Sequence, residues 1–490
     1  MTFEIPSIDY FLLLPLIWIV TWGLVLMFVD LIVPEGRKSL TGWLSLVGIV
    51  PALILTLLQW NQTGATVTPA GGSPMVIVDR YSVFLNAVLL LTGLLTVLIS
   101  VNYLEKVNLN RGEYYMLMLF SLSGMMLMSI ANDLILVFLA LELLSIPLYI
   151  LSGFAVPRLD SEESAMKYFL LGAFSSAFMV FGIALLYGAT GSTALPDLLA
   201  RMGQGGALGM AGAALLLVGF AFKVAAVPFH MWTPDVYEGA PTAVTAFMSV
   251  GAKVGGFAAL IRVFVGALPA LAATWAPAIA VLAALTMILG NVVALAQPNI
   301  KRMLAYSSIA HAGYILIGVA AGVSSPDGVS AALFYMLAYL FTNLGAFAVV
   351  IAVERQHNTG TLLDDFKGLA RRAPLLSLAM AYFMLSLTGV PPTGGFSGKF
   401  YIFRAAIEAD LVWLAVVGVV TSIISGYFYL RVVYLMFMHE GAGEISAKPV
   451  LNVAVALTVL GTLLLGLLPG PWFTAAQQAI LRGVQTLAGG

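Results

Sequence analysis

Long apolar stretches, separated by short polar breaks, succeed one another along almost the whole chain. A membrane-spanning helix needs about 20 apolar residues, and most of these stretches reach that length. Helices satisfy their own backbone groups, so they can cross lipid. We therefore predict an all-α integral membrane protein with about fourteen transmembrane helices. The predicted spans are 10–33, 41–60, 81–103, 114–131, 133–156, 166–188, 209–238, 241–268, 275–296, 302–322, 329–353, 374–410, 411–438 and 449–468.

The composition supports a membrane protein and excludes several classes of function. Of the 490 residues, 61% are hydrophobic and 9% are charged, against roughly 25% charged residues in a soluble domain. The net charge of −1 comes without a basic patch or acidic tail, so nothing suggests a nucleic-acid partner. The sequence has no cysteine, which excludes disulfides and cysteine-ligated clusters in this chain. We interpret the first apolar stretch as a span and not as a signal peptide.

Two of the spans contain helix-breaking sequences. Pro228 interrupts 209–238, and the run VPPTGG, with Pro391 and Pro392, interrupts 374–410. Proline removes a backbone donor and clashes with the preceding turn. Both helices should therefore be discontinuous, which a membrane tolerates only where the backbone is buried in protein or lines a wet cavity.

Basic residues alternate between the two sets of loops. The loops after odd-numbered spans contain Arg37, Lys38, Lys106, Arg111, Arg158, Lys301, Arg302, Arg355, Lys367, Arg371, Arg372 and Lys448. The loops after even-numbered spans carry little beyond Arg201. The alternation holds only if each broken segment is a single crossing. The positive-inside rule then puts both termini on the outer side, and the asymmetry favours a bacterial plasma membrane, with an organelle-encoded chain as the alternative.

The two breaks lie five spans apart, and each has a lysine close by: Lys223 before Pro228, and Lys399 after Pro392. An offset of five helices inverts the topology, as in many transporters. We predict two inverted five-helix repeats, helices 4–8 and 9–13, each with one discontinuous helix. The predicted domains are an N-terminal three-helix unit, a first bundle, a second bundle and a C-terminal helix with a short interfacial tail, at residues 1–110, 111–270, 271–440 and 441–490.

A few ionisable residues lie inside spans, whereas nearly all others lie in loops or at span edges. They are Glu142, Lys167, Lys223, His230, Lys253, His311 and Lys399. Each buried charge costs about 2.5–3.5 kcal/mol on insertion scales. Intramembrane ionisable groups therefore indicate an ion or proton pathway by default.

Structural alternatives remain open for the residues near the first break. Lys167 opens the sixth predicted span and could extend its ammonium group to the interface. Lys223 could be a residue at the end of a span, unless the helix continues past the break. His230 could satisfy the carbonyl groups freed at Pro228.

The remaining ionisable residues also have structural alternatives to a role in transport. Glu142 and Lys253 are flanked by long apolar runs, so only structural pairing competes with a transport role. For His311 we favour packing or capping, with a relay role left open. We interpret Arg262, with Arg404 and Arg431, as interfacial.

This chemistry suits proton transfer between a lysine and a carboxylate. Burial makes an ammonium group release its proton more readily, and a nearby carboxylate opposes the release. Lys223 would thus release its proton when it separates from Glu142 or when Lys253 comes closer to it. His230 could pass protons through waters, because imidazole titrates near neutral pH. The sequence has no nucleotide-binding motif, so the energy must come from a partner or an ion gradient.

Three stretches resemble one known family. They are PFHMWTPDVYEGAPTAVTAFMSVGAK from Pro228, NVVALAQPNIKRMLAYSSIAHAGYILIG from Asn291 and LSLTGVPPTGGFSGKFYIF from Leu385. They resemble subunit N of the proton-pumping NADH–quinone oxidoreductase, respiratory complex I. The resemblance covers essentially the whole chain, with Ala243 as one departure from the motif. It implies an antiporter-like subunit with fourteen helices.

The resemblance also implies roles for individual residues. Glu142 corresponds to the family's fifth-helix glutamate, and Lys167 to the sixth-helix lysine that pairs with it. Lys223 and Lys253 correspond to the lysines of helices seven and eight, with His230 after the break. Lys399 corresponds to the twelfth-helix lysine of the outer half-channel.

Cofactors and partners follow from the same resemblance. It implies that this chain binds no cofactor, and that NAD, FMN, the iron–sulfur clusters and the quinone belong to other subunits. The expected partners are membrane-arm subunits M, L, K, J, A and H, the peripheral arm and membrane lipids, without nucleic acid. One alternative is a subunit of a multisubunit sodium/proton antiporter without redox coupling. Another is a scaffold that transports nothing.

Overall fold

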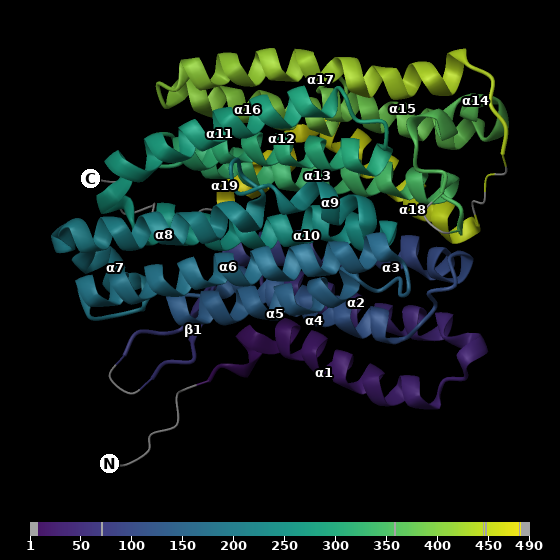
Figure 1. Cartoon of the computed structure of the whole chain (residues 1–490). Coiled ribbons are helices and arrows are strands. Elements are labelled where there is room, and N and C mark those ends of the chain that lie inside the picture. The colour runs from purple at the N-terminus through teal and green to yellow at the C-terminus, as the bar shows by residue number, and fades with distance from the viewer. Residues whose placement is uncertain are drawn as a thin grey trace.

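The computed structural model describes residues 8–69, 72–356, 359–443, 445, 448–479 and 481. Long helices lie side by side with nearly parallel axes, from α1 at one edge to α17 at the other (Figure 1). The predicted C-terminal unit at 441–490, a helix with a short interfacial tail, falls only partly within the described residues. Its described part forms the helix α18 (Pro449–Leu467) and the short helix α19 (Pro469–Gln478).

Most helices of the N-terminal half are long enough to cross a bilayer. The helices of this half are α1 (Tyr10–Ile32), α2 (Ser39–Leu58), α3 (Arg80–Lys106), α4 (Glu113–Ile130), α5 (Leu134–Ser152), α6 (Leu159–Thr190), α7 (Leu195–Arg201), α8 (Gly206–Val224), α9 (Trp232–Gly239) and α10 (Thr242–Ile261), of which α7 and α9 are too short to cross a bilayer. A π-helical segment, Arg262–Ala267, continues α10. The short 3-10 helices of this half are Glu35–Arg37 and Met202–Gln204.

The C-terminal half follows the same pattern. Its helices are α11 (Ala272–Ala294), α12 (Ile300–Ala321), α13 (Asp327–Val353), α14 (Leu369–Arg372), α15 (Pro374–Thr388), α16 (Gly394–Glu408), α17 (Val412–Met438), α18 (Pro449–Leu467) and α19 (Pro469–Gln478). The 3-10 helices Pro269–Leu271 and Leu363–Phe366 lie in connections.

The predicted spans are confirmed. Thirteen helices of the described residues are long and apolar enough to cross a membrane, and the two shorter helices α15 and α16 occupy the remaining predicted span. That the two five-helix sets form an inverted repeat stays a prediction, as do the domain boundaries.

The structure adds local elements that hydropathy did not predict. A small antiparallel hairpin, β1 (Gly64–Thr66) with β2 (Val76–Val78), lies in the connection from α2 to α3. Helix α6 begins seven residues before its predicted start. Acidic residues in its first turn, Asp160 and Glu162, lower the hydropathy yet favour a helix N-terminus.

Burial separates the helices into an inner and an outer group. Helices α10, α12 and α13 are almost wholly enclosed by other helices. Helices α1, α2, α6, α17 and α18 each bury less than half of their most apolar stretch. Their outward faces carry large apolar side chains such as Phe28, Phe174 and Ile423, as expected for helices in contact with lipid.

The first break separates α8 from α9 at the predicted position. Helix α8 ends at Ala225, which has a left-handed φ of 63°, an uncommon conformation for a residue with a side chain. Side chains from elsewhere satisfy the freed backbone groups. Trp232 Nε1 donates to the Phe222 carbonyl at 3.0 Å, and the Val227 N–H donates to Thr286 Oγ1 at 2.9 Å.

The second break separates α15 from α16. Gly389, with φ of 93°, ends α15, and the Thr393 hydroxyl accepts from the Phe396 N–H at 3.3 Å as α16 begins. The same hydroxyl donates to the Val390 carbonyl at 2.7 Å. Both predicted discontinuous helices are thus present. Several freed backbone groups bond to protein side chains, while Pro228, Pro391 and Pro392 are themselves exposed.

Candidate site of buried charged residues

Lys223 lies in the last turn of α8, directly before the first break, and 2% of it is exposed. Its Nζ donates to Ser145 Oγ of α5 at 2.7 Å and to the Tyr168 hydroxyl of α6 at 3.2 Å. The ammonium group also lies 5.4 Å from the centre of the Tyr168 ring, which stacks on Trp232. Neutral polar groups and an aromatic ring therefore stabilise this charge.

Glu142 lies on α5, one helical turn from Ser145, and is half-buried. Its carboxylate accepts from Ser176 Oγ of α6 at 2.5 Å. The ion pairs of the described residues do not include one between Glu142 and Lys223. A cavity of about 10 Å³ between α5, α6 and α8 is lined by Ser145, Ser176 and Lys223. It is about the size that one water needs, so hydrogen-bond partners of both charged groups face one small polar space.

Lys167 has different partners from those that the family resemblance implies. Its Nζ lies 2.6 Å from Glu163 Oε1 and 2.5 Å from Asp235 Oδ2. The pairing with Glu142 is therefore wrong in this structure. Glu142 bonds to Ser176, nine residues further along α6, which is about 13 Å along a helix axis.

The partner of Lys167 belongs to a larger network of ion pairs. Asp235 of α9 also pairs with Arg302 of α12 at 2.7 Å, and Arg302 pairs with Glu238 at 2.9 Å. Lys167 is 40% exposed in its side chain, and the other members of the network are partly exposed. The network joins α6, α9 and α12 beside the first break.

Lys253 lies in the middle of α10 and 3% of it is exposed. Its Nζ donates to the backbone carbonyl of Ser308 on α12. Because α10 is enclosed along its whole length, the ammonium group has no route to an interface. The sequence predicted that the Lys253 ammonium group could not easily reach the membrane interface, and its burial agrees with that prediction.

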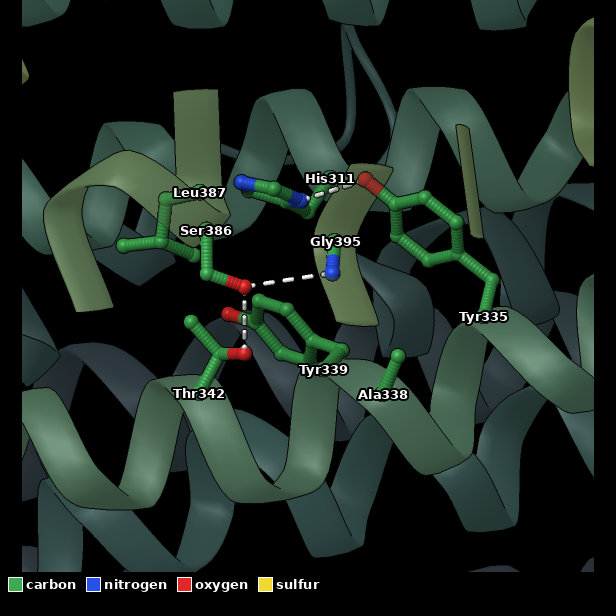
Figure 2. A pocket seen from close by; sticks show the side chains of 8 residues that line it. All are labelled: His311, Tyr335, Ala338, Tyr339, Thr342, Ser386, Leu387 and Gly395. Carbon is green, nitrogen blue, oxygen red and sulfur yellow. Dashed lines mark hydrogen bonds between the residues drawn. The ribbon is translucent and has the colours of Figure 1, made fainter. Parts of the chain in front are cut away.

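His311 is 3% exposed and lies within hydrogen-bond distance of two tyrosines. Nδ1 lies 2.7 Å from the Tyr335 hydroxyl, and Nε2 lies 3.2 Å from the Tyr429 hydroxyl. The Tyr429 hydroxyl continues to Ser307 Oγ at 2.5 Å. Figure 2 shows the ring beside a small cavity whose wall includes Ser386. These contacts belong to a hydrogen-bonded network, whereas the sequence favoured packing or capping.

Lys399 connects the two halves of the second broken helix. Its Nζ donates to the carbonyls of Leu387 and Thr388, each at 2.9 Å, and to Ser422 Oγ at 2.7 Å. The carbonyl end of a helix carries partial negative charge, so the ammonium group caps α15. It also lies 4.7 Å from the centre of the Tyr314 ring.

His230 lies in the turn before α9 and is half-buried. No hydrogen bond joins its side chain to any of the lysines within the described residues. The structure therefore places Lys223 at a cavity that Ser176, the hydrogen-bond partner of Glu142, also lines. Lys253 and His311 lie on the inner helices α10 and α12, and Lys399 lies on α16.

The sequence analysis missed the hydroxyl groups that hold these charges. Ser145, Tyr168, Ser176, Tyr335 and Tyr429 all lie within predicted spans, and their side chains bond to charged or titratable groups. A signal was present, because a serine or tyrosine inside an apolar run needs a partner when buried.

Arg262 lies at the end of α10, where protein groups enclose it. Its guanidinium group is 5% exposed and forms two bonds of 3.0 Å with the carboxylate of Asp79. It also donates to the Ser129 carbonyl at 2.8 and 3.0 Å and lies over the Tyr81 ring at 4.9 Å. Asp79 caps α3, and Ser129 lies near the end of α4. The arginine therefore joins the end of α10 to both helices.

The described residues contain no group of three or more His, Cys, Asp or Glu side chains that could hold a metal ion.

Comparison with known proteins identifies similar chains. The family described as NADH:quinone oxidoreductase/Mrp antiporter, TM, matches residues 131–425. NADH-quinone oxidoreductase subunit N of Chloroflexus aggregans is 51% identical over an alignment of 488 residues that covers 97% of this chain and 98% of that protein. A chain of respiratory complex I from Thermus thermophilus with bound Aureothin is 37% identical, with a TM-score of 0.82 over 95% of this chain and 99% of its own. A chain of the Mrp complex from Dietzia sp. DQ12-45-1b has a TM-score of 0.83, covering 96% of both chains, at 23% identity. That likeness shows the fold alone.

Proposed function

Because this chain belongs to the family of NADH-quinone oxidoreductase subunit N, we propose that it is a proton-translocating membrane subunit of that enzyme, respiratory complex I. It couples quinone reduction in other subunits to proton movement through its own buried charged residues. The observation that carries the proposal is the set of three lysines enclosed in the helix bundle, Lys223, Lys253 and Lys399, each at most 4% exposed. Buried lysines of this kind mark proton pathways in membrane proteins.

Lys223 is the central proton carrier in this proposal, and Glu142 is its modulating partner. The two residues contact Ser145 and Ser176, which line the same cavity. A water in that cavity would bring the two groups into contact through hydrogen bonds. A shift of α8 at its break changes their separation, which alters how firmly Lys223 holds its proton.

Lys253, His311 and Lys399 continue the pathway into the second set of helices. The His311 imidazole has a tyrosine hydroxyl at each nitrogen, an arrangement through which a proton can pass. His230 and Lys167 act nearer the first break, where Lys167 holds α6 to α9 through Asp235. Pro228, Pro391 and Pro392 keep the two helices open beside these charges.

Other subunits supply the chemistry that drives proton transfer. NAD, FMN, the iron–sulfur clusters and the quinone are bound by them, and the partners of this chain are membrane-arm subunits M, L, K, J, A and H, the peripheral arm and lipid. The protein lies in the bacterial plasma membrane. Its termini lie on the outer side, because the lysine- and arginine-rich loops belong inside.

A subunit of a sodium/proton antiporter is the second candidate, favoured by the fold shared with the Mrp complex. Purification of the chain with its native partners separates the two candidates. The proposal expects NADH oxidation by quinone that drives proton uptake into inverted vesicles. Sodium-dependent proton movement by the purified partners without NADH, and no quinone reductase among them, would contradict it.

A further inference from the structure

A second group of buried charges lies at the end of the molecule that carries the lysine- and arginine-rich loops. Glu354 directly follows α13 there, and its side chain is 0% exposed. Three other helix ends meet at the same place: the end of α3, the start of α12 and the corner between α9 and α10. The residues discussed so far do not explain why a carboxylate is enclosed at this point.

One hydroxyl group joins Glu354 to the start of α10. The Tyr103 hydroxyl donates to Glu354 Oε1 at 3.1 Å and accepts from the Thr242 N–H at 2.9 Å. The other carboxylate oxygen, Oε2, is buried and has no hydrogen-bond partner, and Thr242 Oγ1 is in the same condition. Buried polar atoms without partners are rare in proteins and call for a water, an ion or a proton.

Cationic groups face this carboxylate from two other helices. Lys301 of α12 is 0% exposed, and its Nζ donates to the Ala240 carbonyl at 2.7 Å. Lys106 of α3 donates to the carbonyls of Ile351 and Ala352 at 3.1 and 3.3 Å. Both lysines lie close enough to Glu354 to interact with its charge.

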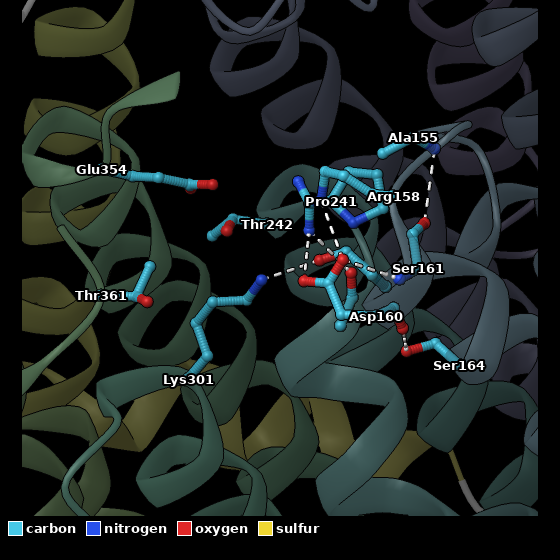
Figure 3. Close-up of polar contacts among 12 residues, drawn as sticks. Ala155, Arg158, Asp160, Ser161, Ser164, Pro241, Thr242, Lys301, Glu354 and Thr361 are labelled. Carbon is cyan, nitrogen blue, oxygen red and sulfur yellow. Dashed lines mark hydrogen bonds and ion pairs between the residues drawn. The ribbon is translucent and has the colours of Figure 1, made fainter. Parts of the chain in front are cut away.

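Further charged groups, Glu238 of α9 among them, surround the two lysines. Arg158 and Asp160 face Lys301 from the start of α6, and Arg355 faces Lys106. Figure 3 shows the Lys301 ammonium group pointing toward Asp160, with Thr242 between Glu354 and that group. Arg158 also donates to the Gly239 carbonyl at 3.0 Å. The corner between α9 and α10 is therefore held by Arg158, Lys301 and Tyr103 without using Glu354 Oε2.

We propose that Glu354 binds a proton taken from the side of the lysine- and arginine-rich loops, before that proton reaches the buried lysines. The proton bonds to Oε2, and the carboxylate is restored when the proton passes to a neighbouring base through water. The site combines a carboxylate, lysines and a tyrosine in a closed space, the residue types that also surround Lys223. This inference rests on the proposed function, because it requires proton movement through the chain.

The position of the site connects it to the rest of the pathway. Thr242 is the first residue of α10, the helix that carries Lys253. The Tyr237 carbonyl accepts from Thr245 of α10, and the Tyr237 hydroxyl interacts with the side chain of Ser308. The Ser308 carbonyl accepts from Lys253. These hydroxyl groups, with water between them and Thr242, would join Glu354 to Lys253.

A glutamine at position 354 separates proton binding from a structural role. The amide oxygen of Glu354→Gln still accepts from Tyr103, but the side chain no longer titrates. In assembled complex in membrane vesicles, NADH-driven proton pumping should fall at least tenfold, because a positioned proton-transfer group contributes about 100-fold or more. Glu354→Asp should restore part of the rate and change its dependence on pH.

The matched control is Glu105→Gln on the same helix end as Tyr103. Glu105 forms a partly exposed pair with Lys448 at 2.8 Å, and its substitution should leave pumping within about twofold, as for a surface pair. Tyr103→Phe removes the bond to Glu354 but keeps the carboxylate. Its pH profile should therefore retain the form of the unmodified protein.

Several results would overturn the proposal. One is wild-type pumping and an unchanged pH profile in Glu354→Gln; another is an equal defect in Tyr103→Phe, which indicates a structural role. If Glu354→Gln does not assemble, infrared difference spectra of the unmodified protein and Glu354→Asp decide. A protonated-carboxyl band that shifts between them supports the proposal, and its absence from both refutes it. Lys223→Met distinguishes the two hypotheses: if it lowers pumping and Glu354→Gln does not, only this inference fails.

Discussion

Replacing Arg262 with glutamine tests whether the enclosed ion pair stabilises the junction of α3, α4 and α10. The arginine makes two bonds of 3.0 Å to Asp79 and two more to the Ser129 carbonyl. The substitution leaves the Asp79 carboxylate, 2% exposed, without its cation. Breaking a buried pair from one side costs about 3–5 kcal/mol, which shifts the unfolding equilibrium by roughly 150- to 4,000-fold.

The assay is equilibrium unfolding of the purified protein in mixed detergent micelles, followed by circular dichroism. Arg37→Gln is the control, since Arg37 is exposed and surface substitutions usually stay within about 0.5 kcal/mol. The double variant Asp79→Asn with Arg262→Gln should lose less than the sum of the single variants, because no unpaired charge remains. A loss under about 1 kcal/mol in Arg262→Gln, or additive losses in the double variant, would refute the reasoning.

Three further substitutions test other contacts. Gly124→Ala should lower the free energy of unfolding by about 1–3 kcal/mol, because the added Cβ would lie 2.3 Å from the backbone nitrogen of Leu144. An unchanged melting temperature would show that α4 and α5 pack less closely than in this structure. Ser145→Ala removes a hydrogen bond of Lys223 and should slow proton pumping about fivefold, which corresponds to about 1 kcal/mol. Ser145→Thr keeps the hydroxyl group and should not slow pumping. Equal pumping rates for the two variants would exclude a role of this hydroxyl group in proton transfer. Asp235→Asn breaks partly exposed ion pairs and should cost about 1 kcal/mol or less in unfolding; a loss above about 3 kcal/mol would mean that the pairs are shielded from solvent.

The sequence predicted the spans and both breaks well because these depend on local properties. The sequence itself shows apolar runs of the right length, prolines at Pro228 and Pro391, and the alternation of basic loops. Each of these signals acts within one span or one loop. The start of α6 was missed because Asp160 and Glu162 favour a helix N-terminus while lowering the local hydropathy.

The partners of the buried charges could not be predicted in this way. Asp79 and Arg262 are 183 positions apart, and Tyr103 and Glu354 are 251 apart, so their contacts depend on how distant helices pack. Lys167 is a second example of a partner that the sequence could not predict. Its position on α6 was known, but which helix lies opposite decides that Asp235 is its partner.

Proton pumping by assembled complex that carries Lys223→Met tests the central claim most directly. Methionine keeps much of the length of the side chain and removes the ammonium group that bonds to Ser145 and Tyr168. Lys448→Met is the control, since this lysine is 51% exposed in its side chain. The account predicts that pumping and quinone reduction both fall roughly tenfold or more in Lys223→Met, with normal assembly and an unaffected control. Unchanged pumping in the assembled variant would contradict the assignment of Lys223 as proton carrier and favour a scaffold.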